Sequence, residues 1–155
     1  MFYNFKTNNT TEKFTTFEMK DLNTKKKYHN FLHIKDLDPK SFIRLFLEKY
    51  NKNSKLNFVT VSGDFPYKWV KPNDVEYLIS IMYSKEKCCG YMNTFSSFIS
   101  SEDAEVGGFA IIFLNTYISQ TKINLGLNSN PKVDVESIKK IEKWYQNSML
   151  VKPQQ

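Results

Sequence analysis

The longest nearly continuous hydrophobic run lies within residues 101–120, in the stretch SEDAEVGGFAIIFLNTYISQ. Phe109 to Leu114 are consecutive apolar residues, and acidic residues precede them. Because negative charge in a first turn favours the helix dipole, we predict a helix over 102–119 with Ser100 or Ser101 as its N-cap. A buried strand is the structural alternative for a short apolar run, but the acidic start and polar end favour a helix. The run is too short to cross a bilayer, which takes about 20 apolar residues.

Gly107 and Gly108 stand inside this predicted helix, where each costs about 1 kcal/mol relative to alanine. We predict that they leave room for a neighbouring element, and the apolar face from Val75 to Met82 is our candidate for it. Gly108→Leu should then overpack the contact and destabilise the fold by about 1–3 kcal/mol. A phosphate-binding loop is the functional alternative, but the glycines lack the following Lys and Ser or Thr of that pattern.

Amphipathic spacing predicts three further helices. Asp38 followed by Pro39 is a typical helix start. Asn73 with Glu76 three residues later resembles a capping box, and Asp134 suits the start of the last helix. The three helices span residues 39–51, 73–84 and 134–148, with apolar positions at Phe42, Ile43, Phe46, Leu47 and Tyr50; at Val75, Leu78, Ile79 and Met82; and at Val135, Ile138, Ile141, Trp144 and Tyr145.

Short strands are predicted where apolar and polar residues alternate, since Phe and Thr favour strands. We therefore expect a helix-dominant α+β domain over residues 1–155, with four helices around the 102–119 helix beside a small, mainly antiparallel N-terminal sheet. An all-α domain is the alternative, and residues 150–155 should form a frayed tail. The predicted strands are Phe2–Lys6, Lys13–Met19, His29–Ile34 and Leu56–Val61, with a further short extended piece within Tyr91–Ile99.

Composition supports one domain that needs no metal or disulfide. The 155 residues are 41% hydrophobic and include 13 Phe, 9 Tyr and 2 Trp, which is enough to bury a core. The first residues, MFYNFKTNN, do not show the pattern of a secretory signal. Cys88 and Cys89 are the only cysteines and are adjacent, so we expect free thiols and a cytoplasmic protein.

The positive charge lies in the first part of the chain. Residues 1–60 hold twelve Lys or Arg and six Asp or Glu, while residues 61–155 hold ten of each, so the net charge of +6 comes from the first 60 residues. A basic half indicates a nucleic-acid or acidic-protein face. However, Arg44 is the only arginine among 22 basic residues, and the lysine run at 25–27 is shorter than a nucleic-acid patch. A solvated lysine surface is therefore favoured over nucleic-acid binding.

Two groups of residues are candidates for binding a partner. One is the basic run Lys25, Lys26 and Lys27. The other is the segment FPYKW, in which Phe65, Tyr67 and Trp69 surround a proline. These aromatic side chains either cap the core or form an exposed anchor, because Tyr and Trp are both highly buried on average and enriched at binding hot spots.

Catalytic and metal-binding patterns are weak. His29 and His33 are four residues apart, a spacing that suits a metal pair on a helix, but no second cysteine pair accompanies them. A Cys88 or Cys89 nucleophile with one of these histidines has the right residue types, so a Cys-dependent enzyme is an alternative. We expect no catalytic residues, no metal and no cofactor.

The order of segments from Trp69 onward resembles small immunity proteins that bacteria pair with secreted or contact-delivered toxins. The segments are WVKPNDVEYLISIM, SSEDAEVGGFAIIFLNTYI, the Asn-rich turn NLGLNSNP and DVESIKKIEKWY. In such proteins a Trp-led helix, a Ser-rich connection and an apolar helix with an early glycine precede a terminal helix. The resemblance covers roughly residues 65–147 and leaves out the first 60 residues.

This resemblance implies a non-catalytic cytoplasmic protein that neutralises a cognate bacterial toxin by binding it, with no membrane contact. Immunity proteins against nuclease toxins are usually acidic, whereas this chain is basic, so the resemblance implies a toxin that is neutral or acidic near its site. The alternatives are a nucleic-acid-binding adaptor or phage accessory protein that uses the basic first 60 residues, and the Cys-dependent enzyme.

Overall fold

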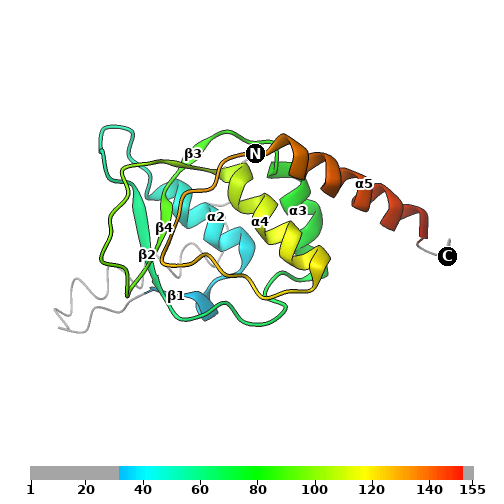
Figure 1. Ribbon diagram of the computed structural model, residues 1–155, viewed down its shortest axis with the longest axis horizontal. Helices are drawn as coiled ribbons and strands as arrows, with labels where there is room; N and C mark the ends of the chain where they lie inside the picture. The colour runs from blue at the N-terminus through cyan, green and yellow to red at the C-terminus, as the bar shows by residue number, and fades with distance from the viewer. Residues whose placement is uncertain (1–31, 152–155) are drawn as a thin grey trace.

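The computed structural model describes residues 32–151. Within that range four α-helices and six short strands form a helix-dominant α+β fold, which confirms the predicted class (Figure 1). The elements in chain order are β1 (Leu32–His33), η2 (Ile34–Asp36), α2 (Pro39–Glu48), β2 (Phe58–Ser62), η3 (Pro72–Asp74), α3 (Val75–Ile81), β3 (Lys87–Cys88), β4 (Gly90–Asn93), β5 (Ala104–Glu105), α4 (Val106–Ser119), β6 (Asn128–Ser129) and α5 (Val135–Val151), where η marks a 3₁₀ turn.

The main sheet has the order β1-β2-β4-β6. β1, β2 and β4 are parallel, and β6 pairs antiparallel with β4. The prediction of a mainly antiparallel sheet is therefore wrong for the part of the chain that the structure describes. The reason is connectivity: α2 lies between β1 and β2, and α3 lies between β2 and β4. A helical crossover returns the chain in the same direction, which makes the strands parallel.

Three of the five predicted extended segments are found as strands, and the other two lie outside the described residues. Leu56–Val61 corresponds to β2, and the extended piece within Tyr91–Ile99 corresponds to β4. His29–Ile34 is represented by β1, after which Ile34 enters a 3₁₀ turn. The strands predicted at Phe2–Lys6 and Lys13–Met19 lie outside the described residues.

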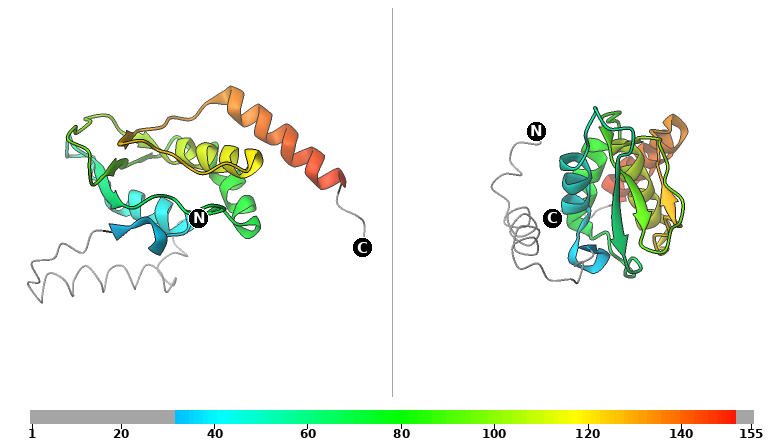
Figure 2. Two further views of the ribbon diagram at one scale, coloured as in Figure 1. Left: turned by 60° about the horizontal axis from the view of Figure 1, so that its bottom comes forward. Right: turned by 90° about the vertical axis from the view of Figure 1, so that its left-hand side faces the viewer.

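The core is built around α4, as predicted. Phe109 and Phe113 on this helix are fully buried and meet the rings of α2 and of the loop after β2. The centroid of Phe113 is 5.2 Å from that of Phe42 and 5.0 Å from that of Trp69. α4 contacts α2, α3 and α5, and the strands lie in front of the helices in the right-hand view of Figure 2. One face of the sheet is thus covered by helices.

The beginning of α4 differs from the prediction. The helix starts at Val106, and Ser100 and Ser101 do not cap it. Ala104 and Glu105 instead pair as β5 with β3, and the N–H of Val106 donates to the carbonyl of Glu86 at 2.9 Å. The first N–H groups of the helix are therefore satisfied by backbone carbonyls of a distant segment, so no side-chain cap is needed.

The two glycines of α4 face different neighbours. A Cβ on Gly107 would overlap the carbonyl oxygen of Met82, the last residue of the predicted packing face, and would lie 2.7 Å from that of Ser84. A Cβ on Gly108 would lie 2.8 Å from the backbone nitrogen of Lys132 and closer still to Pro131. Close packing is thus the reason for both glycines, but the segment at Gly108 is Pro131–Lys132 and not the predicted face of α3.

Two of the four predicted helix caps are present. An oxygen of the Asp38 carboxylate accepts the N–H of Ser41 at 2.7 Å, which completes a capping box. Asp134 accepts the hydroxyl of Ser137 at 2.6 Å before α5. Asn73 does not cap the second helix, because the chain enters η3 one residue earlier. Asp74 accepts the N–H of Lys71 there at 2.8 Å.

α5 extends beyond the other elements at its C-terminal end (Figures 1 and 2). Its first half is anchored by Ile138 and Ile141, which are buried. The helix continues through Val151, two residues into the segment expected to be a tail, and residues 152–155 lie outside the described range. None of the described helices combines the length and the apolar character that crossing a membrane requires.

Candidate protein-binding groove

The segment FPYKW divides its aromatic side chains between the core and the surface. Phe65 and Trp69 are buried, and the indole Nε1 of Trp69 donates to the carbonyl of Leu37 at 2.7 Å. Tyr67 is 65% exposed. Phe65 and Trp69 therefore hold the segment in place, and Tyr67 is the one predicted aromatic residue whose side chain is free to contact a partner.

Lys68 and Gln120 are the only non-glycine residues with positive φ in the described chain, each at 56°. Gln120 ends α4 in the left-handed conformation. The hydroxyl of Tyr67 donates to the carbonyl of Gln120 at 3.3 Å, which ties the two segments together. Left-handed backbone costs a residue with a Cβ about 1–2 kcal/mol, and such strain is often found at functional sites.

A first surface depression of about 240 Å³ lies between these segments. It combines aromatic and polar side chains, and lysines are the only charged residues among those that line it. The lining residues are Pro66, Tyr67, Lys68, Trp69, Val70, Lys71, Pro72, Thr116, Tyr117, Gln120, Thr121 and Ile123.

A second depression of about 590 Å³ adjoins the first, because both are lined by Pro72 and Tyr117. It runs toward α5, where the ring of Trp144 lies edge-on to that of Tyr117 with 6.0 Å between centroids. Glu76 is the only charged residue in its lining. We call the two depressions together the aromatic groove; the lining of the second is Pro72, Asn73, Val75, Glu76, Tyr117, Trp144, Tyr145 and Ser148.

The strain at Gln120 gives a direct prediction. Gln120→Gly should raise the free energy of unfolding by about 1 kcal/mol, because glycine adopts the left-handed end of a helix without steric cost. Gln146 is exposed within α5, so Gln146→Gly should instead lower it by about 1 kcal/mol. Urea denaturation of both variants checks the opposite signs, and a loss of stability in Gln120→Gly would mean that its side chain stabilises the fold.

The other candidate residues do not gather at this groove. Lys25, Lys26, Lys27 and His29 lie outside the described residues. His33 is in β1, and its Nδ1 accepts the N–H of Lys35 at 3.2 Å. No group of three or more His, Cys, Asp or Glu residues suited to a metal ion occurs within residues 32–151.

Both cysteines are buried in the core as free thiols. Burial raises the pKa of Cys88 far above its usual range and raises that of Cys89 to about 11. The thiolate is the nucleophilic form, so these thiols lack the low pKa and the access that a catalytic cysteine needs.

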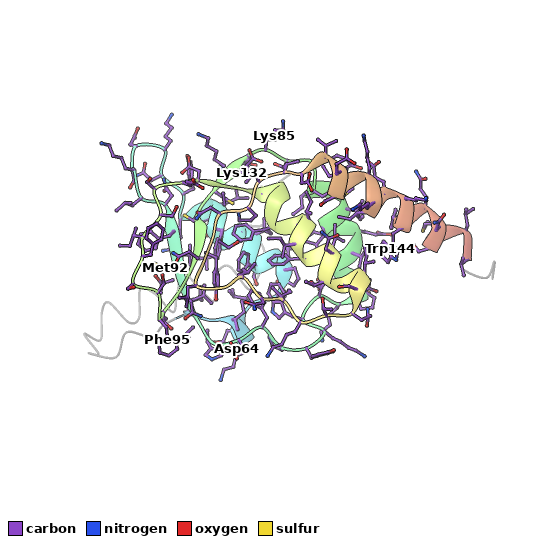
Figure 3. All side chains as sticks on the ribbon, in the orientation of Figure 1. Asp64, Lys85, Met92, Phe95, Lys132 and Trp144 are labelled. Carbon is purple, nitrogen blue, oxygen red and sulfur yellow. The ribbon has the colours of Figure 1, made fainter. Side chains whose placement is uncertain are left out.

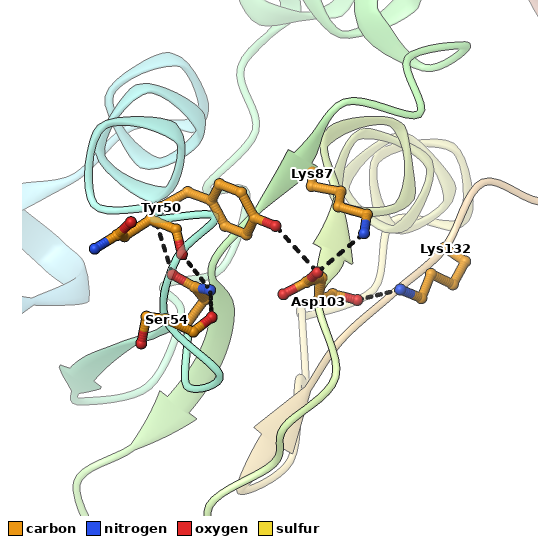
Figure 4. A network of polar contacts seen from close by, with 7 residues as sticks. Tyr50, Ser54, Lys87, Asp103 and Lys132 are labelled. Carbon is orange, nitrogen blue, oxygen red and sulfur yellow. Dashed lines mark hydrogen bonds and ion pairs between the residues drawn. The ribbon is translucent and has the colours of Figure 1, made fainter.

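A separate polar cluster, outside the aromatic groove, connects several loops around Asp103. The carboxylate of Asp103 accepts the Tyr50 hydroxyl at 3.1 Å and pairs with the Lys87 ammonium at 3.4 Å (Figure 4). The Lys132 ammonium donates to the backbone carbonyl of Asp103. The cluster joins segments that follow α2, precede β5 and precede α5, so we assign it a structural role.

A second exposed surface lies on the loop after β4. Phe95 is 86% exposed and lies at the opposite end of the molecule from Trp144 (Figure 3). Phe98, Ile99 and Leu127 are also exposed, and the side chain of Asn128 donates to the carbonyl of Phe98 at 2.9 Å. This apolar loop is held in place but lines neither depression of the aromatic groove.

Comparison with known proteins gives no relative. No family model matches the chain, and neither a curated protein nor a solved structure is significantly similar to it. The aromatic groove is therefore the feature from which function has to be argued.

Sequence reasoning singled out Tyr67 and Trp69, which both line the first depression, but missed the other residues of the groove. Trp144 and Tyr145 lie on α5, where their spacing predicted an apolar face, and Tyr117 lies on α4, where no prediction was made for its side chain. Each is only partly buried.

Proposed function

We propose that this chain is a non-catalytic binding protein of the immunity class, which neutralises a cognate bacterial toxin by binding it through the aromatic groove. The aromatic groove carries this proposal, because Tyr67, Tyr117, Trp144 and Tyr145 line two adjoining depressions. Tyrosine and tryptophan dominate binding hot spots, since each offers a large contact area at a small entropic cost.

Two further features support the immunity class. The segment order from Trp69 to Tyr145 resembles immunity proteins, and the first depression, whose charged lining residues are Lys68 and Lys71, suits a toxin whose bound surface is neutral or acidic. A cytoplasmic location is part of the proposal, and the free thiols of Cys88 and Cys89 are its support.

Neither alternative has a comparable observation in its favour. A nucleic-acid adaptor would use the basic first 60 residues, where Arg44 is the only arginine and the lysine run at 25–27 is shorter than a nucleic-acid patch. A Cys-dependent enzyme would need an accessible thiolate, whereas Cys88 and Cys89 are buried with raised pKa values.

The proposal predicts a partner encoded next to this gene. Co-expression of the chain with the adjacent gene product should restore growth if that product is toxic, and the two proteins should co-purify. Tyr67→Ala should weaken binding at least about tenfold, because truncation of a hot-spot tyrosine removes much of the binding free energy. Tyr67 is 65% exposed, so this variant should keep its fold.

Phe95→Ala is the matched control, because it removes an exposed aromatic ring from the apolar loop outside the groove. It should bind the partner like the wild type. An adjacent product that neither harms growth nor binds would refute the immunity proposal. Binding that depends on Phe95 and not on Tyr67 would move the site to the apolar loop.

A further inference from the structure

Strained backbone stands on both sides of the first depression, at Lys68 and at Gln120. Both residues line the first depression, and both have a φ of 56°. Glycine is the residue that tolerates this conformation best. The side-chain Nε2 of Gln120 donates to the carbonyl of Tyr117 at 2.6 Å and so closes the end of α4. Lys68 instead holds an exposed, charged side chain at its strained position, which is typical of a residue kept for binding at some cost in stability.

The charge of the groove is divided between its ends. Lys68 and Lys71 are the charged residues of the first depression, and Glu76 is that of the second. Neither lysine forms an ion pair with another described residue, and the nearby Asp74 carboxylate accepts the backbone N–H of Lys71. The two ammonium groups are thus exposed and suited to a carboxylate, while the second depression offers the rings of Tyr117 and Trp144 to an apolar side chain.

We infer that the aromatic groove binds an extended acidic segment of the partner protein. Lys68 and Lys71 hold a carboxylate of that segment, and a neighbouring apolar side chain lies against Tyr117 and Trp144. This inference rests on the proposed function for the identity of the partner, but it concerns the chemistry of the bound segment alone.

A nucleic acid fits the groove less well than an acidic peptide. A phosphate backbone that follows both depressions would pass Glu76, whose carboxylate repels it. The groove also lacks arginine, whose guanidinium binds phosphate in a bidentate manner. A peptide can place its single carboxylate at the lysines and present an uncharged residue beside Glu76.

A random 12-residue peptide library displayed on phage tests the inference without knowledge of the partner. The library is selected on the full-length chain and counter-selected on Tyr67→Ala. We expect enriched peptides that contain Asp or Glu next to an apolar residue. Lys68→Gln and Lys71→Gln should each weaken their binding about tenfold, because each removes a charge-assisted hydrogen bond.

Lys85→Gln is the matched control, since it removes the same charge from an exposed site beyond the other end of α3 (Figure 3). Its affinity for the selected peptides should equal that of the wild type. The inference is overturned if no peptide is enriched, if the enriched peptides lack acidic residues, if Lys85→Gln weakens binding as much as Lys68→Gln does, or if a 12-nucleotide oligothymidylate competes for the site.

The peptide selection tests the acidic segment, and the co-expression assay tests the immunity class, so either hypothesis can be rejected without the other. Neutralisation of a toxin without enrichment of acidic peptides would leave the proposed function intact and reject the acidic segment. Enrichment of acidic peptides without a toxic neighbour would keep the groove chemistry and reject the immunity class.

Discussion

Phe113→Ala is expected to lower the free energy of unfolding by about 3–5 kcal/mol, the range for removal of a buried aromatic ring. Phe113 is fully buried on α4. Its ring lies 5.0 Å from that of Trp69 and 5.2 Å from that of Phe42, so one truncation removes contacts with the loop after β2 and with α2. A domain with a stability of about 5–15 kcal/mol would lose a large part of it. Urea denaturation monitored by tryptophan fluorescence measures the change.

Phe95→Ala provides the matched control, because the same substitution is made where the ring is 86% exposed. Surface substitutions of this kind usually change stability by less than about 0.5 kcal/mol. The difference between the two variants then reports burial and not the chemistry of phenylalanine. Equal losses in both variants would contradict the arrangement in which α4 carries the core.

Features with a local cause were predicted from the sequence. Asp38 and Asp134 lie next to the helices that they cap, and their partners Ser41 and Ser137 are three residues away. The apolar stripe of α3 was found by its spacing: Val75, Leu78 and Met82 are buried as expected, and Ile79 is partly buried. In each case the residues concerned lie close together along the chain, so a short window of sequence holds the whole signal.

Features that depend on distant segments were missed. The beginning of α4 is fixed by the pairing of Ala104 and Glu105 with Lys87 and Cys88, which no local pattern reveals. The direction of the strands, in contrast, does have a signal in the sequence. Strands and helices alternate along the chain in the order β1, α2, β2, α3 and β4, and this order favours parallel pairing. The order of the predicted elements therefore indicates a parallel sheet, whereas the alternation in the first residues indicates an antiparallel one.

The candidate groove could be predicted from the sequence only in part. Tyr67 could be selected because aromatic residues cluster in FPYKW, but its neighbours come from α4 and α5, about 50 and 78 residues further along the chain. The strain at Lys68 and Gln120 could not be predicted from the sequence either. Only glycine and, to a lesser degree, asparagine indicate a positive φ. Burial patterns place a side chain on a helix face, but only the packed structure shows which faces remain open.

Gly108→Leu should destabilise the fold by about 3 kcal/mol or more, at or beyond the upper end of the usual overpacking range. The first atom of the new side chain is the Cβ. It would overlap the backbone of Pro131 and lie 2.8 Å from the backbone nitrogen of Lys132. A flexible side chain could move aside, but this segment is backbone and is held in place. The carbonyl of Pro131 accepts the N–H of Glu105 at 2.9 Å, and the Glu105 carboxylate accepts the N–H of Val133 at 2.7 Å.

Relief of the overlap would therefore require either a shift of α4 or the loss of these hydrogen bonds, and both disturb the entry to α5. Asn115→Leu places the same side chain at an exposed position of α4 and should change stability by less than about 0.5 kcal/mol. Thermal unfolding of the two variants separates a steric effect from a general effect of added leucine. A Gly108→Leu variant as stable as Asn115→Leu would show that the Pro131–Lys132 segment moves freely, and the connection between α4 and α5 would then not be fixed by packing.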